Sequence, residues 1–243
     1  MKSGLKYRRI LLKLSGEALA GERGKPSALD PMVCRKVARE IASVRSKGVE
    51  IGIVIGGGNI LRGTSAGDIP RVTADTMGML ATVINSLALA SFLEEAGCPA
   101  QVLTAVSVHG AGERFSTLKA REYLANGSAV IIAGGTGNPF FTTDTAAALR
   151  CAEIGAQVLL KATKVDGIYD SDPVRNRKAK RFESITHAEA LARNLKVMDA
   201  TAFSFCRENN IPIIVFKFAV NGNLLKCIEG KKVGTIVTTG GLS

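Results

Sequence analysis

The sequence predicts an α/β fold, a three-layer sandwich in which helices cover both faces of a central, mostly parallel sheet. Two observations support this prediction. Short apolar runs of strand length alternate along the chain with longer segments of helical period, which is the pattern of strand–helix–strand units. Glycine, at 26 of 243 residues, is enriched without a collagen-like repeat, and its clusters follow apolar runs, as tight turns at strand ends require.

In the first half of the chain, helix start and stop signals separate the apolar runs. Asp30-Pro31 is an N-cap followed by proline at the first helical position, and Gly48 stops the same helix. Gly97 closes a long helix, and Asn126-Gly127 closes a shorter one. The expected strands are 7–14, 50–55, 100–104 and 128–133, and the expected helices are 31–47, 74–96 and 118–125.

The second half continues the alternation around an irregular basic segment, 164–181, in which Asp166-Gly167 has the composition of a hairpin turn. Thr186 and Glu189 form a capping box that opens a helix, and another helix follows Asp199. The remaining expected strands are 157–162, 213–218 and 235–238, with helices at 143–154 and 221–229. No linker interrupts the chain, so a single domain, 1–243, is expected, with its softest division near 162–163.

Composition places the chain among soluble globular proteins. It is 46% hydrophobic and 22% charged, which excludes global disorder. The net charge of +11 favours an anionic partner: nucleic acid, a membrane surface or a phosphorylated small molecule. Five scattered cysteines without a CxxC pair favour a reducing compartment over a disulfide framework or zinc site. No apolar run approaches ~20 residues, so we expect a cytoplasmic protein without a membrane helix.

Three glycine-rich segments follow expected strands, where ligands bind in open α/β sheets. They are Gly16 beside Lys13, the segment 56–59 (GGGN), and the segment 134–144 (GGTGNPFFTTD). Their free backbone N–H groups suit phosphate, although each turn alone could be a simple loop. The dinucleotide fingerprint is absent because Leu61 occupies its third glycine position, and no P-loop motif occurs.

Several polar side chains near these turns have both a functional and a structural interpretation. Lys13, inside an apolar strand, is either a phosphate-binding ammonium or a strand-edge lysine that reaches water. Asp144 and Asp75 could serve the site or act as acids in the first turn of a helix. Arg62 could reach phosphate or lie on a solvated surface, and Tyr169 could stack on a base or pack in a turn.

Two larger features also leave alternatives open. The helix with apolar residues on nearly every side, 77–87, is either buried in the core or part of a subunit interface. The basic run 175–181 lacks interleaved aromatic residues, so it favours a solvated face over a nucleic-acid site.

Taken together, the motifs resemble the bacterial UMP kinase (uridylate kinase) family of the amino-acid kinase superfamily, in order along almost the whole chain. The matching segments are 13–19 (KLSGEAL), 56–59 with Arg62, Asp75 with 77–82 (MGMLAT), 136–144 (TGNPFFTTD), 161–167 (KATKVDG) and 196–199 (KVMD). The resemblance implies an amino-acid kinase-like fold and the reaction ATP + UMP → ADP + UDP. It also implies an acceptor-binding part near 1–162 and an ATP-binding part near 163–243.

The resemblance implies roles for particular residues. Lys13 and Asp144 would be catalytic, with Asp144 orienting Lys13 and the reacting groups. The residues implied for ATP are Lys13, Ser15, Gly16, Gly58, Arg62, Thr163, Tyr169 and Asp172. The residues implied for UMP are Gly57, Asp75, Thr136, Gly137, Asn138, Pro139, Phe140, Phe141, Thr142 and Thr143.

The same resemblance implies Mg²⁺ carried by the ATP phosphates without a protein ligand, a homohexamer, and UTP as feedback inhibitor. Neither a nucleic acid nor a membrane is expected as partner. One departure concerns the segment 21–30 (GERGKPSALD), where relatives often carry a shorter G-Phe-Gly-Ile-Asp-like sequence, so activation by GTP is left open. The alternatives are a carbamate or amino-acid kinase of the same superfamily and a basic nucleic-acid-binding regulator.

Overall fold

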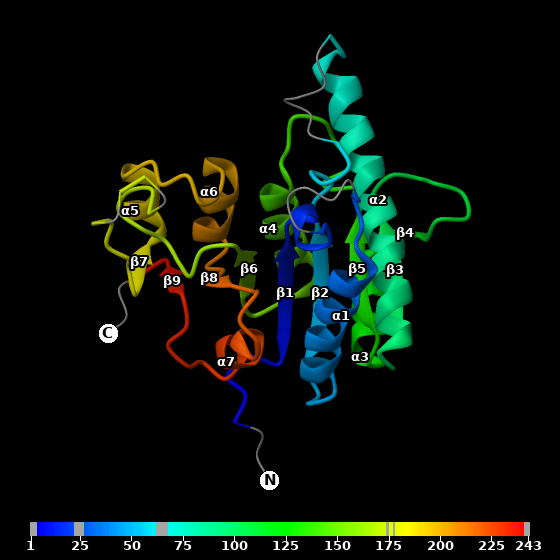
Figure 1. The fold of residues 1–243 in the computed structure, drawn as a ribbon, viewed down its shortest axis with the longest axis horizontal. Coiled ribbons are helices and arrows are strands. Elements are labelled where there is room, and N and C mark those ends of the chain that lie inside the picture. Colours follow the sequence, from blue (N-terminus) through cyan, green and yellow to red (C-terminus); the bar gives the residue numbers. More distant parts are fainter. Residues whose placement is uncertain (1–3, 22–26, 62–67, 174, 177, 241–243) are drawn as a thin grey trace.

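A computed structural model describes residues 4–21, 27–61, 68–173, 175–176 and 178–240. In this part of the chain nine strands form one sheet in the order β4-β3-β5-β2-β1-β6-β8-β9-β7, which Figure 1 shows from right to left. The strands are β1 Arg9–Leu14, β2 Glu50–Ile55, β3 Ala100–Thr104, β4 Glu113–Arg114, β5 Ala129–Ala133, β6 Leu159–Thr163, β7 Ser184–Thr186, β8 Ile213–Lys217 and β9 Thr235–Thr238.

Every strand pair is parallel except β8 with β9, which is antiparallel. The connections contain the 3-10 turn η1 Gly16–Ala18 and seven helices within the described residues. These helices are α1 Pro31–Arg45, α2 Arg71–Glu95, α3 Thr117–Ala125, α4 Thr143–Ile154, α5 His187–Ala192, α6 Ala200–Glu208 and α7 Asn223–Ile228. The predicted mostly parallel α/β sheet is therefore confirmed.

The helices cover the two faces of the sheet because strand side chains alternate between them. Ile10 and Leu12 of β1 point to one core, which also contains apolar residues of α1, α2 and α7. Leu11, between them, points to the other core, together with residues of α3, α4, α5 and α6. The predicted three-layer sandwich is confirmed (Figure 1).

Three predicted helix caps are found where the sequence places them. Asp30 caps α1 by accepting a hydrogen bond from the Met32 N–H at 2.9 Å. Thr186 and Glu189 form the reciprocal capping box of α5, and Asp199 caps α6. A side-chain acceptor satisfies backbone donors that have no partner inside the helix, which fixes where each helix begins.

The hairpin predicted at Asp166-Gly167 is wrong. β6 ends at Thr163 and pairs only with its parallel neighbours β1 and β8. Tyr169 instead forms an isolated antiparallel bridge with Arg181. Gly167 is needed for a different reason: a Cβ there would lie 2.6 Å from the Thr235 hydroxyl, so the backbone packs directly against the start of β9.

The helix α2 differs from the prediction in where it begins and in how apolar it is. It begins at Arg71, one residue after Pro70, and not at residue 74. Although no membrane helix was expected, α2 is long and apolar enough to span a bilayer, with 25 residues and a mean hydropathy of 1.6 over its most apolar stretch. Core helices of soluble proteins share these properties, and here α2 packs against α1, β3 and β5.

His187, at the start of α5, is fully buried, and burial lowers the pKa of its imidazole from the ordinary value of 6.5. As the pH falls below 6.5, the His187 imidazole binds a proton in the unfolded chain but not in the folded chain. The folded state therefore loses stability as the pH falls. Between pH 7 and pH 5 we expect the free energy of unfolding to fall more steeply for the wild-type protein than for His187→Gln. The difference between the two slopes is up to about 1.4 kcal/mol per pH unit.

Urea titrations of both proteins at pH 8, 7, 6 and 5 measure this difference. The free-energy gap between the two proteins stays constant above pH 7 because the imidazole is neutral in both states there. If the plots of unfolding free energy against pH were parallel for the two proteins over the whole pH range, His187 would have the same pKa in the folded and the unfolded chain.

Candidate active site

The carboxyl ends of β1, β2, β5 and β6 meet at one edge of the sheet because these strands are parallel neighbours. Within this edge Lys13 of β1 is the register partner of Lys161 of β6. Register partners on adjacent strands point to the same face, so the two ammonium groups approach the same space from two strands.

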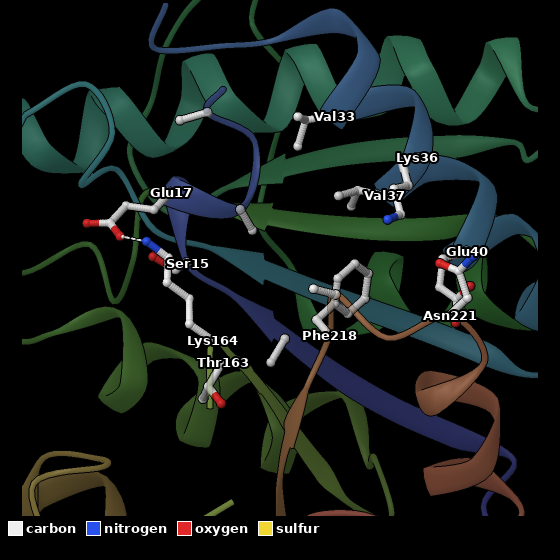
Figure 2. A pocket seen from close by; sticks show the side chains of 14 residues that line it. Ser15, Glu17, Val33, Lys36, Val37, Glu40, Thr163, Lys164, Phe218 and Asn221 are labelled. Atoms are coloured by element: carbon white, nitrogen blue, oxygen red, sulfur yellow. Dashed lines mark hydrogen bonds and ion pairs between the residues drawn. The ribbon is translucent and has the colours of Figure 1, made fainter. Parts of the chain in front are cut away.

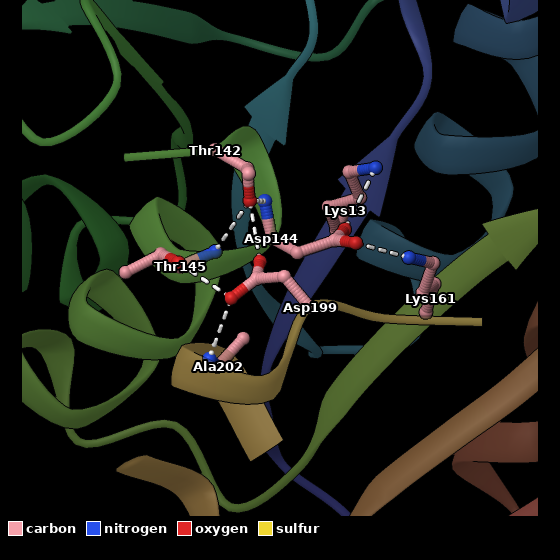
Figure 3. Close-up of polar contacts among 7 residues, drawn as sticks. All are labelled: Lys13, Thr142, Asp144, Thr145, Lys161, Asp199 and Ala202. Atoms are coloured by element: carbon pink, nitrogen blue, oxygen red, sulfur yellow. Dashed lines mark hydrogen bonds and ion pairs between the residues drawn. The ribbon is translucent and has the colours of Figure 1, made fainter. Parts of the chain in front are cut away.

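Asp144, in the first turn of α4, lies between these lysines. Its Oδ1 is 2.8 Å from the Lys13 Nζ, and its Oδ2 forms an ion pair with Lys161 (Figure 3). The side chains of Lys13, Asp144 and Lys161 are only 13%, 14% and 9% exposed. One carboxylate thus holds together two positive charges that would otherwise repel, and the triad keeps a net charge of +1.

Burial and charge oppose each other at Asp144. Burial alone would raise its pKa, but the charges of Lys13 and Lys161 and their hydrogen bonds outweigh burial, and the pKa is lowered. At Lys161, burial lowers the pKa, while the Asp144 carboxylate opposes that shift. The carboxylate is therefore ionised at neutral pH and acts as a fixed negative centre for both ammonium groups.

A second set of polar contacts ties the start of α4 to the start of α6. Thr142 caps α4 and donates its hydroxyl proton to Asp199 at 2.5 Å, and Thr145 donates to the same carboxylate at 3.0 Å (Figure 3). Asp199 also accepts from the Ala202 N–H at 2.9 Å. One carboxylate thus fixes α6 relative to the loop that carries Asp144.

The glycine turns after β1 and β2 pack so closely that no side chain fits. A Cβ at Gly16 would lie 2.5 Å from the Gly56 carbonyl oxygen, and a Cβ at Gly57 would lie 2.8 Å from the Gly78 carbonyl oxygen of α2. Asn85 of α2 holds the turn after β2 in place: it donates to the Gly56 carbonyl at 2.7 Å and exchanges hydrogen bonds with Asn59. The two turns are thereby held as one rigid backbone surface.

Next to these turns is a cavity of about 300 Å³ between the Gly57 turn, α2 and the loop before α4. Among the residues that sequence analysis assigns to UMP, those lining it are Gly57, Asp75, Thr136, Asn138, Phe141, Thr142 and Thr143. Gly137, Pro139 and Phe140 belong to the same loop without lining the cavity. The structure therefore brings most of the assigned acceptor residues together around one space.

Asp75, which lines the cavity, has two structural partners. It pairs with Arg71 at 2.8 Å and accepts a hydrogen bond from the Phe140 N–H at 2.9 Å. Burial favours a raised pKa, but these two partners prevail and the pKa of Asp75 is lowered. Phe140 itself has φ +72°, an uncommon conformation for a non-glycine residue, and the hydrogen bond to Asp75 stabilises it.

The residues assigned to ATP spread along the sheet edge beyond Lys13. Ser15 and Gly16 follow β1, Gly58 is exposed in the turn after β2, and Thr163 ends β6, where its hydroxyl donates to the Val165 carbonyl at 2.6 Å. Arg62 lies outside the described residues.

Farther along the same edge, Tyr169 and Asp172 lie in the segment after β6. The Tyr169 hydroxyl donates to Asp166 at 2.6 Å, which lowers the pKa of that carboxyl group. The structure thus places these two residues in the segment after β6, outside β1, α4 and β6, which carry the triad.

Sequence reasoning did not assign a role to three residues of this site: Lys161, Asp199 and Arg71. Lys161 carries the same signal as Lys13, a lysine inside an apolar strand, and could have been found by it. Asp199 enters the sequence analysis as a helix start and as the end of the matching segment 196–199. Its bonds to Thr142 and Thr145 give it a place in the site that local sequence does not predict, because they cross more than fifty residues of chain.

A parallel sheet whose carboxyl edge joins glycine turns, two largely buried lysines and a bridging aspartate is typical of enzymes that handle phosphoryl groups. Comparison with known families agrees. The chain belongs to the amino acid kinase family, whose model matches residues 8–217.

Curated relatives are similar over almost the full chain. A protein named uridylate kinase from Bacteroides thetaiotaomicron is 55% identical over 234 residues, which cover 96% of this chain and 98% of that protein. The chloroplastic uridylate kinase PUMPKIN of Arabidopsis thaliana is 49% identical and is covered over 70% of its length. The crystal structure of UMP kinase from Bacillus anthracis superposes with a TM-score of 0.92 at 38% identity, covering 96% of both chains.

Proposed function

We propose that this protein is a UMP kinase that transfers the γ-phosphoryl group of ATP to UMP, giving UDP and ADP. The observation that supports this most directly is the Lys13–Asp144–Lys161 triad, which lies beside the glycine turns at the carboxyl ends of the strands. Family membership and the similarity to uridylate kinases over the full chain favour this reaction over the alternatives.

The chemistry fits the residues present. The acceptor is a phosphate oxygen that is already anionic at neutral pH, so no strong general base is needed. What remains is to align two polyanions and to stabilise the charge of the transferred phosphoryl group. Lys13 and Lys161 supply that charge from fixed positions, since Asp144 holds both ammonium groups before substrate arrives.

The two nucleotides would approach the triad from opposite sides. UMP would occupy the cavity beside Asp75 and Thr143, with its phosphate near the Gly57 turn. ATP would lie over the ends of β1 and β6, with its phosphates at Ser15 and Gly16 and its adenosine toward Tyr169. On this proposal the acceptor part, 1–162, and the donor part, 163–243, meet at β6.

Magnesium would be carried by the phosphates of ATP, whose negative charge it would partly neutralise. The donor set at the triad supports this arrangement, since both oxygens of Asp144 already contact lysines. Elsewhere in the described part of the chain no group of three or more His, Cys, Asp or Glu side chains gathers at one place. On this proposal magnesium belongs to the bound nucleotide.

Self-association, as a homohexamer, belongs to the same proposal. Along α2 an apolar stripe faces away from the sheet, while buried residues of the same helix pack inward. The stripe consists of Val72, Met77, Leu80, Ile84 and Leu87, each 38–49% exposed. An apolar helical face of this kind is typical of a subunit interface.

UTP as feedback inhibitor, a cytoplasmic location and a place in pyrimidine nucleotide biosynthesis complete the proposal.

Replacing Ile84 and Leu87 by lysine should dissociate the assembly, because each lysine would place an unpaired charge within an apolar contact. We expect the mass measured by light scattering after size exclusion to fall to that of a smaller species at micromolar concentration. The control is Leu118→Lys on α3, which alters a leucine that is 77% exposed outside the stripe. An unchanged mass for the double variant would show that this stripe does not join subunits.

The reaction itself is tested by ADP release, coupled to a second enzyme, with UMP, CMP, dUMP, carbamate, glutamate and aspartate as acceptors. We expect turnover with UMP to exceed that with carbamate or either amino acid by several orders of magnitude. Turnover with carbamate or glutamate alone would identify another activity of the amino acid kinase family. Salt-sensitive binding to duplex nucleic acid without any turnover would favour a regulator instead.

A further inference from the structure

A second cavity opens at the same edge of the sheet, on the face opposite to Asp144. It lies between α1 and the segment that follows β8, and its volume is about 310 Å³ (Figure 2). This volume is at the lower end of the range of small-ligand pockets, which is roughly 300–1,000 Å³. The proposed reaction uses neither α1 nor the segment after β8, so this space needs a separate explanation.

The walls of this cavity are mainly apolar. Val33 and Val37 of α1 face Phe218 across it, as Figure 2 shows. Small side chains complete the lining: Ala18, Ala20, Ala162 and Ala219. Water gains few hydrogen bonds against such walls, so an apolar body of matching size would replace it favourably.

The mouth of the cavity is positively charged. Lys36 lines it and also lines an adjoining open hollow with Arg35 and Arg39, so cavity and hollow are continuous along α1. Arg35 is paired with Glu95 at 2.7 Å, but among the described ion pairs none includes Lys36 or Arg39. Glu40 lines both spaces as well, so the mouth holds Lys36 and Arg39 against one carboxylate and keeps a net positive charge that favours an anion.

The carboxylates near the mouth are already engaged. Glu40 accepts a hydrogen bond from the Gly222 N–H at 2.9 Å, which holds the segment after β8 against α1. Glu17 pairs with Lys164 at 2.6 Å at the other end of the cavity (Figure 2). These contacts shape the cavity from both ends, and they leave one carboxylate, Glu40, against the two cations Lys36 and Arg39 at the mouth.

We propose that this cavity is a binding site for an amphipathic anion: a compact aromatic or branched apolar body that carries one carboxylate or phosphate group. The body fills the space between Val33 and Phe218, and the anionic group lies at Lys36 and Arg39. An aromatic acid and an aryl phosphate share this chemistry. The site is separate from the one proposed for ATP, although Ser15 and Thr163 border both.

The probe for this site is 8-anilinonaphthalene-1-sulfonate, whose fluorescence rises in an apolar environment, titrated into the full-length protein without nucleotide. Val33→Phe fills the cavity and should abolish the saturable binding. Lys36→Gln should weaken it roughly tenfold, the loss of one charge-assisted contact. The matched control is Lys226→Gln, an exposed lysine on α7 away from the mouth, which should leave the affinity unchanged.

Displacement of the probe distinguishes the possible ligands. We expect 1-naphthoate or 1-naphthyl phosphate to displace it and neutral 1-naphthol to do so at least about tenfold less well. The better of the two anions identifies the group that the mouth prefers. Equal displacement by the neutral alcohol, or equal probe affinity in the wild-type protein and both cavity variants, would overturn the proposal.

A last measurement separates this cavity from the donor site. The probe should remain bound at saturating ATP, because its cavity and the lysine triad lie on opposite faces of the sheet. Complete exclusion of the probe by ATP would mean that the cavity is part of the donor site and would overturn the proposal. Since the first titration uses no nucleotide, its result is independent of which acceptor the enzyme phosphorylates.

Discussion

Replacing Lys13 by alanine should reduce kcat about a thousandfold while the protein still folds. The ammonium group lies 2.8 Å from Asp144 and its side chain is only 13% exposed, so it is fixed where the transferred phosphoryl group would pass. Losing one preorganised charge of this kind costs roughly 10²–10³ in rate. The KM for UMP should change much less, because the acceptor cavity is lined by other residues. Initial-rate kinetics at saturating ATP and UMP measure both quantities.

The matched control for this variant is Lys47→Ala, which removes an exposed lysine after α1. It should keep wild-type turnover, and the circular dichroism and thermal midpoint of both variants should match the wild-type protein within a few degrees. Turnover of Lys13→Ala near the wild-type level would remove Lys13 from the reaction.

Asp144→Asn should affect stability and turnover together. The substitution keeps the shape of the side chain but leaves Lys13 and Lys161 as two buried, uncompensated charges. Removing one partner of a buried ion pair costs about 3–5 kcal/mol of folding free energy. We expect an unfolding free energy lower by this amount at pH 7 and a kcat reduced at least a hundredfold. Urea denaturation and the coupled ADP assay measure the two effects.

A double variant separates the two roles of this carboxylate. Asp144→Asn combined with Lys161→Met removes one of the uncompensated charges, so it should recover much of the lost stability. It should not recover turnover, since both groups are proposed to act on the phosphates. Recovery of neither stability nor activity would show that the instability of Asp144→Asn has another origin than charge.

Most of the fold could be predicted because its signals are local. The strand 50–55 and the helix 143–154 coincide with β2 and α4, since a continuous apolar run and a threonine cap define their ends. The strands β4 and β7 were missed, because two and three residues are too few for a periodic pattern. They exist through pairing with β3 and β9, which no local sequence pattern contains.

The candidate site shows the same division between local and distant signals. Lys13 and the glycine turns stand out in the sequence because a lysine in an apolar strand and clustered glycines are locally unusual. The proposed role of Asp144 depends on its ion pair with Lys161 of β6. Lys161 lies beside Lys13 only because β6 pairs with β1 in the folded sheet. The link from Asp199 to Thr142 likewise joins two helix starts that are distant in sequence.

If subunits meet along α2 as proposed, this helix would connect their assembly with substrate binding. Its inner side carries Asn85, which holds the Gly56 turn, and Thr82, which accepts a hydrogen bond from the Gly134 N–H at 2.8 Å. Its outer side carries Leu80 and Ile84, one or two residues away along the chain. A neighbouring subunit that shifted this helix would therefore reposition the floor of the acceptor cavity directly. A rearrangement of the subunits would then change the affinity for UMP, with no effector molecule bound near the substrate.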